Sequence, residues 1–336
     1  MDKSTTDSWT ILDQSPSIDS PDHQLLASPS GQFAQSVFVN KYGPSTLLQI
    51  GLRDVATCVS TKPFEGIKQV IFLVPGNPGV IGFYETTMRW LYEDTKIPII
   101  GLGHPGLSNK LLTGVSGPMT IRKQVLHKLD FIENIIPKDV EIILIGHSIG
   151  AFMTMEIMKG IQDRDRIRHN ILLMPAIHDL GGSIGAKFLR VFYFLRFFVY
   201  LGVFFLWLLP EKLIYRMVRG ICSIFVKELD EPSMHAFMQL RSIRATCNSL
   251  SLADDELDQV TDRDDLLIRH NLSRFSFVYI AFDEWVPARQ RDDLLENHPE
   301  ADVTVVEGVV HAFMLDHRMT RKVIETLSSK LGLLKT

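Results

Sequence analysis

The stretch Ile142-Ile143-Leu144-Ile145-Gly146-His147-Ser148-Ile149-Gly150 decides the fold of this chain. Its first four residues form an apolar run typical of a buried strand, and a Gly-x-Ser-x-Gly pentapeptide follows directly. After a strand, this pentapeptide predicts a sharp strand-to-helix turn that exposes the serine hydroxyl. Both glycines are needed because a Cβ at either position would clash with the closely spaced backbones. The turn predicts Ser148 as a nucleophile, and the alternative interpretation is an ordinary Gly/Ser turn that opens a helix.

Short apolar runs alternate with helical segments on both sides of this turn. Helical patterns cover Ala151–Lys159 and Met119–Ile136. Strands are expected at Leu47–Arg53, Gln69–Val74, Ile97–Gly101, Glu141–Ile145, Asn170–Met174, Phe275–Ala281 and Val303–Val306. Almost wholly apolar strands that alternate with helices indicate an α/β fold with a mostly parallel sheet covered by helices on both faces.

The composition argues against several classes of function. The 336 residues carry a net charge of −4 and no stripe of basic and aromatic residues, so we expect no nucleic-acid binding. Cys58, Cys222 and Cys247 are scattered and match neither a disulfide framework nor a zinc site. A cleaved secretion signal is not expected, because no basic segment followed by an apolar one opens the sequence. We also expect no metal ion and no organic cofactor.

Four segments are expected along the chain. Residues 1–36 are rich in Ser, Asp, Gln and Pro, which predicts a disordered polar leader. Residues 37–180 and 275–336 are predicted to form the two parts of one α/β core. Residues 181–274 lack strand signals between them, and we expect a helical insertion that covers the Ser148 turn as a cap.

The first half of this insertion is unusually apolar. Phe188 to Trp207 holds ten aromatic residues, and Glu211–Lys227 then repeats basic residues opposite apolar ones, which predicts a basic amphipathic helix. Phe197–Leu209 is uncharged over 13 residues, which is short for a membrane span. Three interpretations of residues 188–227 stay open: a monotopic anchor on a lipid surface, which we favour, ordinary buried cap helices, or a spanning helix or hairpin.

A serine nucleophile needs a base and an acid later in the chain. His311 follows the last expected strand and is the predicted base, because His298 precedes that strand and His317 begins the last helix. Asp283 ends the strand before and is the predicted acid, which would orient the imidazole of the base. Asp179, after an earlier strand, is the alternative acid.

Two backbone amides are expected to form an oxyanion hole. One is the N–H of Ile149, directly after the nucleophile. The other is the N–H of Asn77, in a Pro/Gly-rich turn after an apolar strand, because the next residue, Pro78, has no N–H to donate. Nucleophile, acid, base and oxyanion hole in this order predict a serine hydrolase with the α/β-hydrolase fold. Serine at the turn argues against an epoxide hydrolase with an aspartate nucleophile.

Several motifs of the sequence together resemble the lipid droplet-associated hydrolase family, over about residues 65–330. They are Pro75-Gly76-Asn77-Pro78-Gly79 followed by Phe83-Tyr84, Gly146-His147-Ser148-Ile149-Gly150, Asp283 with Trp285, and His311-Ala312-Phe313. The pairing of the first motif with the pentapeptide is more specific than either alone. The chain departs from the family pattern in its long polar leader and in Glu284, where the family can carry proline.

The resemblance implies an α/β-hydrolase at the surface of the endoplasmic reticulum and of lipid droplets, on the cytosolic face. It implies turnover of neutral lipid esters, sterol esters especially. By motif position, Ser148 would be the nucleophile, Asp283 the acid and His311 the base.

The leading expectation is therefore a serine ester hydrolase that acts on sterol esters or acylglycerols at such a surface. Its partners would be the ester and a phospholipid monolayer, contacted through residues 188–227. One alternative is a droplet-binding organiser with weak or vestigial activity, and another is a soluble carboxylesterase or thioesterase. The sequence identifies no protein partner.

Overall fold

The computed structural model describes residues 33–52, 62–107, 119–226, 229–240 and 242–334. The expected leader up to residue 32 and Cys58 lie outside these described residues, so the structure bears on neither.

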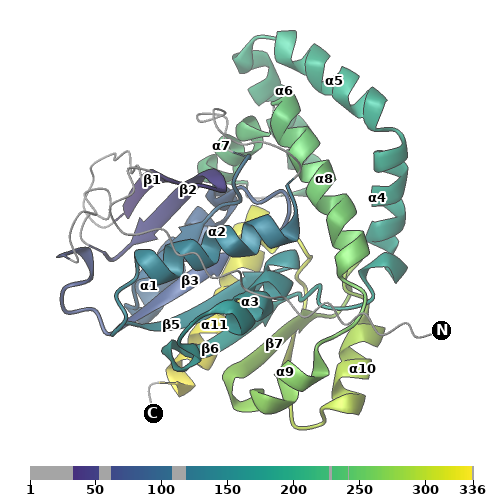
Figure 1. Ribbon diagram of the computed structural model, residues 1–336. Coiled ribbons are helices and arrows are strands. Elements are labelled where there is room, and N and C mark those ends of the chain that lie inside the picture. The colour runs from purple at the N-terminus through teal and green to yellow at the C-terminus, as the bar shows by residue number, and fades with distance from the viewer. Residues whose placement is uncertain (1–32, 53–61, 108–118, 227–228, 241, 335–336) are drawn as a thin grey trace.

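An eight-stranded sheet forms the centre of the described molecule (Figure 1). Its strands are β1 (Phe33–Asn40), β2 (Gly43–Ile50), β3 (Gln69–Val74), β4 (Ile99–Leu102), β5 (Glu141–His147), β6 (Ile167–Leu173), β7 (Phe275–Ile280) and β8 (Asp302–Val306). Their order in space is β1-β2-β4-β3-β5-β6-β7-β8, and β3 to β8 run parallel. β3, β5 and β7 are buried along nearly their whole length, because both faces of the sheet are covered.

Helices pack on the two faces of this sheet. On one face lie α1 (Glu85–Thr95) and α11 (His317–Leu333), and on the other α2 (Ile121–Asn134) and α3 (Ile149–Gly160). The short helices α9 (Asp265–His270) and α10 (Ala288–Asn297) join the second group. The predicted α/β fold with a mostly parallel, doubly covered sheet is confirmed.

A hairpin at the edge of the sheet differs from the sequence prediction. β1 begins at Phe33, inside the expected leader, and pairs antiparallel with β2, which itself starts four residues before the expected Leu47. The Tyr42 N–H donates to the Asn40 side chain at 3.0 Å and so stabilises the turn. β1 buries only every second residue in its second half, Phe38 among them. It therefore lacks the continuous apolar run that marks the central strands.

Six described helices follow β6 and precede β7. They are α4 (Ile184–Phe194), α5 (Arg196–Leu208), α6 (Glu211–Phe225), α7 (Glu231–Gln239), α8 (Ile243–Gln259) and α9. Figure 1 shows α4, α5 and α6 curving around the outer side of the molecule, and we call these three helices the arch. α4 and α5 pack against α8, and α6 packs against α7. The arch thus packs against α7 and α8, the inner cap helices, and the Gly185 N–H of α4 also donates to the Glu284 carbonyl at 2.8 Å.

A break at Leu195 separates α4 from α5 within the apolar run. The guanidinium of Arg196 donates to the Tyr193 carbonyl at 3.1 Å and lies 4.6 Å from the Tyr193 ring. The Tyr193 carbonyl at the end of α4 thus accepts from this guanidinium as well as from the Leu195 N–H. Among the described helices none is by itself long and apolar enough to cross a bilayer, and α4 with α5 up to Leu206 meets that criterion only as a pair bent by 76°.

The arch exposes its apolar side chains. Of the 22 large apolar side chains that are exposed among the described residues, 17 lie between Ile184 and Ile224. Phe194 is 82% exposed and Phe197 is 68% exposed. These helices therefore differ from the buried cap helices that the sequence left open, because α7 and α8 cover only their inner side. An apolar surface of this extent is unusual for a protein in water.

Candidate active site

Ser148 lies in a strained turn between β5 and α3. Its φ of 55° and ψ of −124° are rarely adopted by residues other than glycine. A Cβ on Gly146 would lie 2.4 Å from the Gly150 carbonyl oxygen, and a Cβ on Gly150 would lie 2.4 Å from the Val74 carbonyl oxygen. Both glycines are therefore required by the close approach of α3 to β3 and β5.

The structure brings Ser148, His311 and Asp283 together at the carboxyl ends of three parallel strands. Ser148 follows β5, Asp283 follows β7, and His311 follows β8. The Ser148 Oγ lies 2.9 Å from His311 Nε2, and His311 Nδ1 lies 2.8 Å and 3.0 Å from the two carboxylate oxygens of Asp283. Because the carboxylate can only accept, Nδ1 donates to it and Nε2 is left to accept from the Ser148 hydroxyl.

Asp283 is held in place by its own loop. Its side chain is 2% exposed, and its Oδ1 also accepts from the N–H groups of Trp285 at 2.8 Å and Val286 at 3.0 Å. The carboxylate is therefore oriented toward His311 before any substrate binds. A carboxylate held in this way fixes the orientation of the imidazole to which it is hydrogen-bonded.

The alternative site residues lie elsewhere. Asp179, the other candidate acid, is half exposed and pairs with Arg289 at 2.6 Å. His298 pairs with Asp265 at 2.7 Å, and His317 lies 3.4 Å from Asp230. None of these three groups contacts Ser148.

The loop Pro75–Gly79 lies against the Ser148 turn. A Cβ on Gly76 would lie 3.0 Å from the Ser148 Cβ. Within the described part of the chain, the backbone N–H groups of Asn77 and Ile149 form no backbone hydrogen bond. Both amides are therefore free to donate to a ligand beside Ser148, as an oxyanion hole requires. We call Pro75–Gly79 the oxyanion loop, after the role that the sequence predicts for it.

A chain of buried hydrogen bonds joins the oxyanion loop, the Ser148 turn and the His311 loop. The Gly76 N–H donates to the Tyr84 Oη at 3.1 Å, Tyr84 Oη lies 2.7 Å from His147 Nδ1, and His147 Nε2 lies 3.1 Å from the His311 carbonyl oxygen. Burial lowers the pKa of His147, so its ring is neutral and carries one N–H. That N–H donates to the carbonyl, and Nδ1 accepts from the Tyr84 hydroxyl. Every group in the chain is thus satisfied.

The oxyanion loop also packs against the buried residue His104. The His104 N–H donates to the Gly79 carbonyl at 2.9 Å, and a Cβ on Gly79, which has a φ of 77°, would lie 2.3 Å from the His104 ring. Lys128 Nζ lies 3.1 Å from His104 Nδ1, and burial lowers the pKa of this lysine to about 7. The loop therefore has little room to move on this side.

A cavity of about 370 Å³ opens onto Ser148. Its lining is mostly apolar and includes Val80, Phe83, Leu189, Phe237, Leu240, Leu250, Trp285, Met314 and Leu315. Asn77 and Glu256 also line it, and the Asn77 side chain donates to Glu256 Oε1 and to the Ser249 carbonyl, both at 3.0 Å. Burial raises the pKa of Glu256 to about 8, so this carboxyl is mainly neutral at pH 7.

Sequence reasoning did not assign a role to Tyr84, His147 or Glu256. Tyr84 and His147 belong to motifs that the resemblance quotes, which is a signal that could have found them. Glu256 lies in the acidic half of the insertion, where nothing local distinguishes it from its neighbours. Only its contact with Asn77, 179 residues earlier, identifies it.

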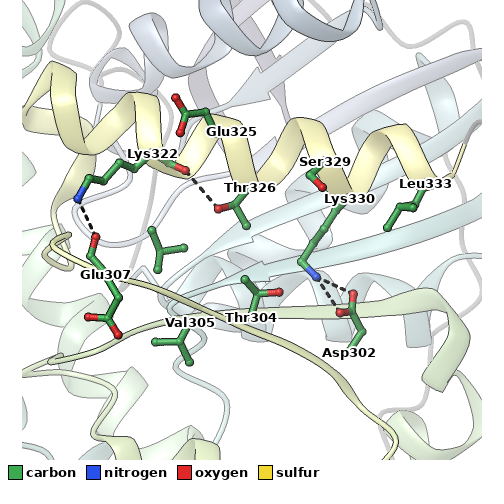
Figure 2. A pocket seen from close by; sticks show the side chains of 11 residues that line it. Asp302, Thr304, Val305, Glu307, Lys322, Glu325, Thr326, Ser329, Lys330 and Leu333 are labelled. Carbon is green, nitrogen blue, oxygen red and sulfur yellow. Dashed lines mark hydrogen bonds and ion pairs between the residues drawn. The ribbon is translucent and has the colours of Figure 1, made fainter.

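A second hollow, of about 660 Å³, lies between β8 and α11 (Figure 2). Figure 2 shows Lys330 reaching the Asp302 carboxylate and Lys322 donating to the Glu307 carbonyl. This hollow shares no lining residue with the Ser148 cavity, and no histidine lines it. The Ser148 cavity is therefore the candidate active site.

Comparison with known proteins relates the chain to one family. The family described as "Lipid-droplet associated hydrolase" matches residues 67–314. A relative from Gallus gallus named "Lipid droplet-associated hydrolase" is 30% identical over 261 residues, covering 74% of this chain and 80% of the relative. A relative of the same name from Mus musculus is 30% identical over 268 residues, covering 74% of this chain and 81% of the relative.

Solved structures resemble the chain in fold. An esterase from Exiguobacterium antarcticum superposes with a TM-score of 0.54 at 15% identity, covering 90% of this chain and 100% of the esterase. A thermophilic esterase from Thermogutta terrifontis superposes with a TM-score of 0.55 at 14% identity, covering 91% of this chain and 100% of that enzyme. At this level of identity the likeness establishes the α/β-hydrolase fold and not the reaction.

Proposed function

This chain belongs to the lipid-droplet associated hydrolase family, and we propose that it is a serine ester hydrolase acting on neutral lipid esters at a lipid surface. The observation that carries the proposal is the continuous contact from Ser148 through His311 to Asp283. A serine hydroxyl becomes a competent nucleophile when a base accepts its proton and an acid orients that base.

The proposed reaction proceeds through an acyl-enzyme. His311 Nε2 takes the Ser148 proton as Oγ attacks the ester carbonyl, and Asp283 stabilises the imidazolium. The N–H groups of Asn77 and Ile149 hold the oxyanion. His311 then protonates the departing alcohol, and the acyl group stays on Ser148. Water, deprotonated by His311, attacks this ester, and the proton passes from His311 to the Ser148 Oγ as the fatty acid leaves.

An apolar ester fits the cavity better than a polar one. Its volume of about 370 Å³ lies at the lower end of ordinary ligand pockets, and its lining is mostly apolar. Leu189 of α4 lines this cavity, whereas Phe188 and Phe192 of the same helix are exposed on the outer side. One helix thus separates the cavity from the apolar outer surface, which supports a substrate that arrives from a lipid phase.

We propose that the arch is a monotopic anchor. On α6 the apolar side chains of Leu213, Met217 and Ile221 are exposed, and Lys212 and Arg216 are exposed on another side of the helix. Such a helix lies in a lipid interface with its apolar side among acyl chains and its cations near phosphates. The name of the relatives directs us to the lipid droplet, and we place the enzyme there and on the cytosolic face of the endoplasmic reticulum. In this proposal residues 181–274 form one cap insertion in the core.

Labelling with a fluorophosphonate tests the chemistry. We expect the native protein to be labelled and the Ser148→Ala variant not to be, because the probe forms a bond with an activated serine. Equal labelling of the two folded proteins would exclude Ser148 as the nucleophile. Absence of labelling in a folded, lipid-bound native protein would instead favour a droplet-binding organiser.

The substrate is identified by parallel assays. Sterol esters, acylglycerols and short-chain esters are compared on phospholipid-coated emulsions and in solution, with Ser148→Ala as the control. We expect faster turnover of a neutral lipid ester on the emulsion. Preference for short esters in solution, with no gain at the interface, would favour a soluble carboxylesterase or thioesterase.

A further inference from the structure

We propose that Glu256, on the cap helix α8, is a positioning residue that holds the oxyanion loop through the side chain of Asn77. The inference deepens the proposed function, because it assigns a role to the cap in the same active site. Glu256 itself touches neither Ser148 nor His311, and it would act through the backbone of Asn77.

The Asn77 carboxamide is held by α8 alone among the described elements. Its Nδ2 donates one hydrogen to Glu256 Oε1 and the other to the Ser249 carbonyl oxygen, both at 3.0 Å. Both hydrogens of the amide are therefore used, and the orientation of the side chain is determined. Because the side chain and the amide N–H belong to the same residue, α8 restrains the N–H that is proposed to bind the oxyanion.

The protonation state of Glu256 suits this position. The side chain is 7% exposed, and among the described residues no lysine or arginine forms an ion pair with it. The charged group that acts on it is Asp255 on the same helix, and His311, which pairs with Asp283, lines the same cavity. Burial raises the pKa of Glu256, so the carboxyl accepts from Asn77 without placing a negative charge beside the developing oxyanion.

Helix α8 is itself hydrogen-bonded to the core, so it can hold the side chain of Asn77 in place. Asp255 Oδ2 accepts from the Ile121 N–H at 2.7 Å, at the start of α2, and Asn248 Nδ2 donates to the Gly106 carbonyl at 2.7 Å. The other side of α8 packs against α4 and α5 of the arch. Helix α8 therefore lies between the proposed lipid anchor and the oxyanion loop and contacts both.

Three variants of the full chain separate this role from general packing. Glu256→Met keeps the volume of the side chain and removes the acceptor, whereas Glu256→Gln keeps an amide oxygen that can accept from Asn77. Asp258→Ala is the matched control, because Asp258 is an exposed carboxylate on the same helix. Each is assayed with p-nitrophenyl butyrate and for hydrogen exchange in the peptide that covers residues 74–80.

We expect Glu256→Met to lower kcat by about 10- to 100-fold with little change in KM, because an oxyanion contact forms only in the transition state. Hydrogen exchange in residues 74–80 should rise in the same variant. Glu256→Gln should restore both values toward the native ones, and Asp258→Ala should leave both unchanged. Unchanged kcat and unchanged exchange in Glu256→Met, or an equal loss in Asp258→Ala, would overturn the inference.

The hydrogen-exchange measurement keeps this inference separate from the proposed function. If native protein and Ser148→Ala hydrolyse the ester equally, the serine mechanism fails. The exchange of residues 74–80 then still decides whether Glu256 holds the loop, because it does not depend on turnover.

Discussion

The Ser148 cavity and the arch differ in whether their side chains find partners within the protein. Around Ser148, the polar groups are buried and donate to one another in a continuous network. In the arch, most large side chains are apolar and exposed. The polar groups around Ser148 find their hydrogen-bond partners within the chain. The arch instead exposes apolar area, and moving this area out of water would lower the free energy. The contrast fits the two proposed roles, because catalysis at Ser148 needs fixed geometry, whereas the arch needs a lipid surface to cover its apolar side chains.

The largest expected effect is on the chemistry alone. Ser148→Ala should lower ester hydrolysis by at least about 1,000-fold, because removing a nucleophile from a triad leaves only binding and oxyanion stabilisation. The melting temperature and binding to phospholipid-coated triolein droplets should not change. Loss of droplet binding in this variant would mean that the two regions are not independent.

The next effect is on location alone. The double change Phe197→Glu and Phe204→Glu places charges on α5 and should weaken droplet binding by about 100-fold or more, since burial of each phenylalanine is worth about 1.5–3 kcal/mol. Hydrolysis of p-nitrophenyl butyrate in solution should persist. Leu266→Glu, at an exposed apolar position outside the arch, is the control in the same flotation assay and should bind as the native protein does.

A smaller effect is expected within the network. Tyr84→Phe removes the hydroxyl between Gly76 and His147, which should lower kcat by about 10-fold and the free energy of unfolding by about 1–2 kcal/mol. Denaturant unfolding and steady-state kinetics measure the two. Tyr279→Phe is the matched control, because that buried hydroxyl has no partner among the described residues. If both variants behave alike, the network does not position the site.

The smallest effect concerns pH. Burial raises the pKa of Glu256 to about 8, above that of the unfolded chain, so the folded state binds the extra proton. The stability that this proton confers is complete below the unfolded pKa and is lost as pH rises toward 8. Between pH 5 and pH 8 the melting temperature of the native protein should therefore fall by about 3 °C more than that of Glu256→Gln. Parallel curves for the two proteins would contradict this.

The fold and the proposed triad could be predicted from the sequence because their signals are local. Gly146-His147-Ser148-Ile149-Gly150 after a strand, Asp283 at the end of another, and His311 after a third each carry a local pattern. Parallel strands bring their carboxyl ends to one edge of the sheet, so local patterns sufficed to expect the meeting of these side chains. Their catalytic roles stay a proposal that Ser148→Ala tests.

Two other features depended on strand pairing and on a side-chain contact that the local pattern does not reveal. The strand Phe33–Asn40 has a weak apolar pattern and forms because it pairs with β2. The apolar run of the arch breaks at Leu195, where Arg196 contacts the end of α4, and neither proline nor glycine announces this break. Local propensity predicts neither the strand nor the helix break, because strand pairing and side-chain capping determine them.

The sequence by itself determined the fold class, the turn that presents Ser148 and the order of the residues proposed to act with it. The reason is that each of these features can be recognised from neighbouring residues: the apolar run of a strand, the glycines that the turn requires, and a polar residue where a strand ends. Only the tertiary structure decided which groups support that site. Glu256 meets Asn77, and His147 meets Tyr84, because packing of α8 and of the turn Ile81–Tyr84 on the core brings together residues that are far apart in the chain. The raised pKa of Glu256 follows mainly from that burial.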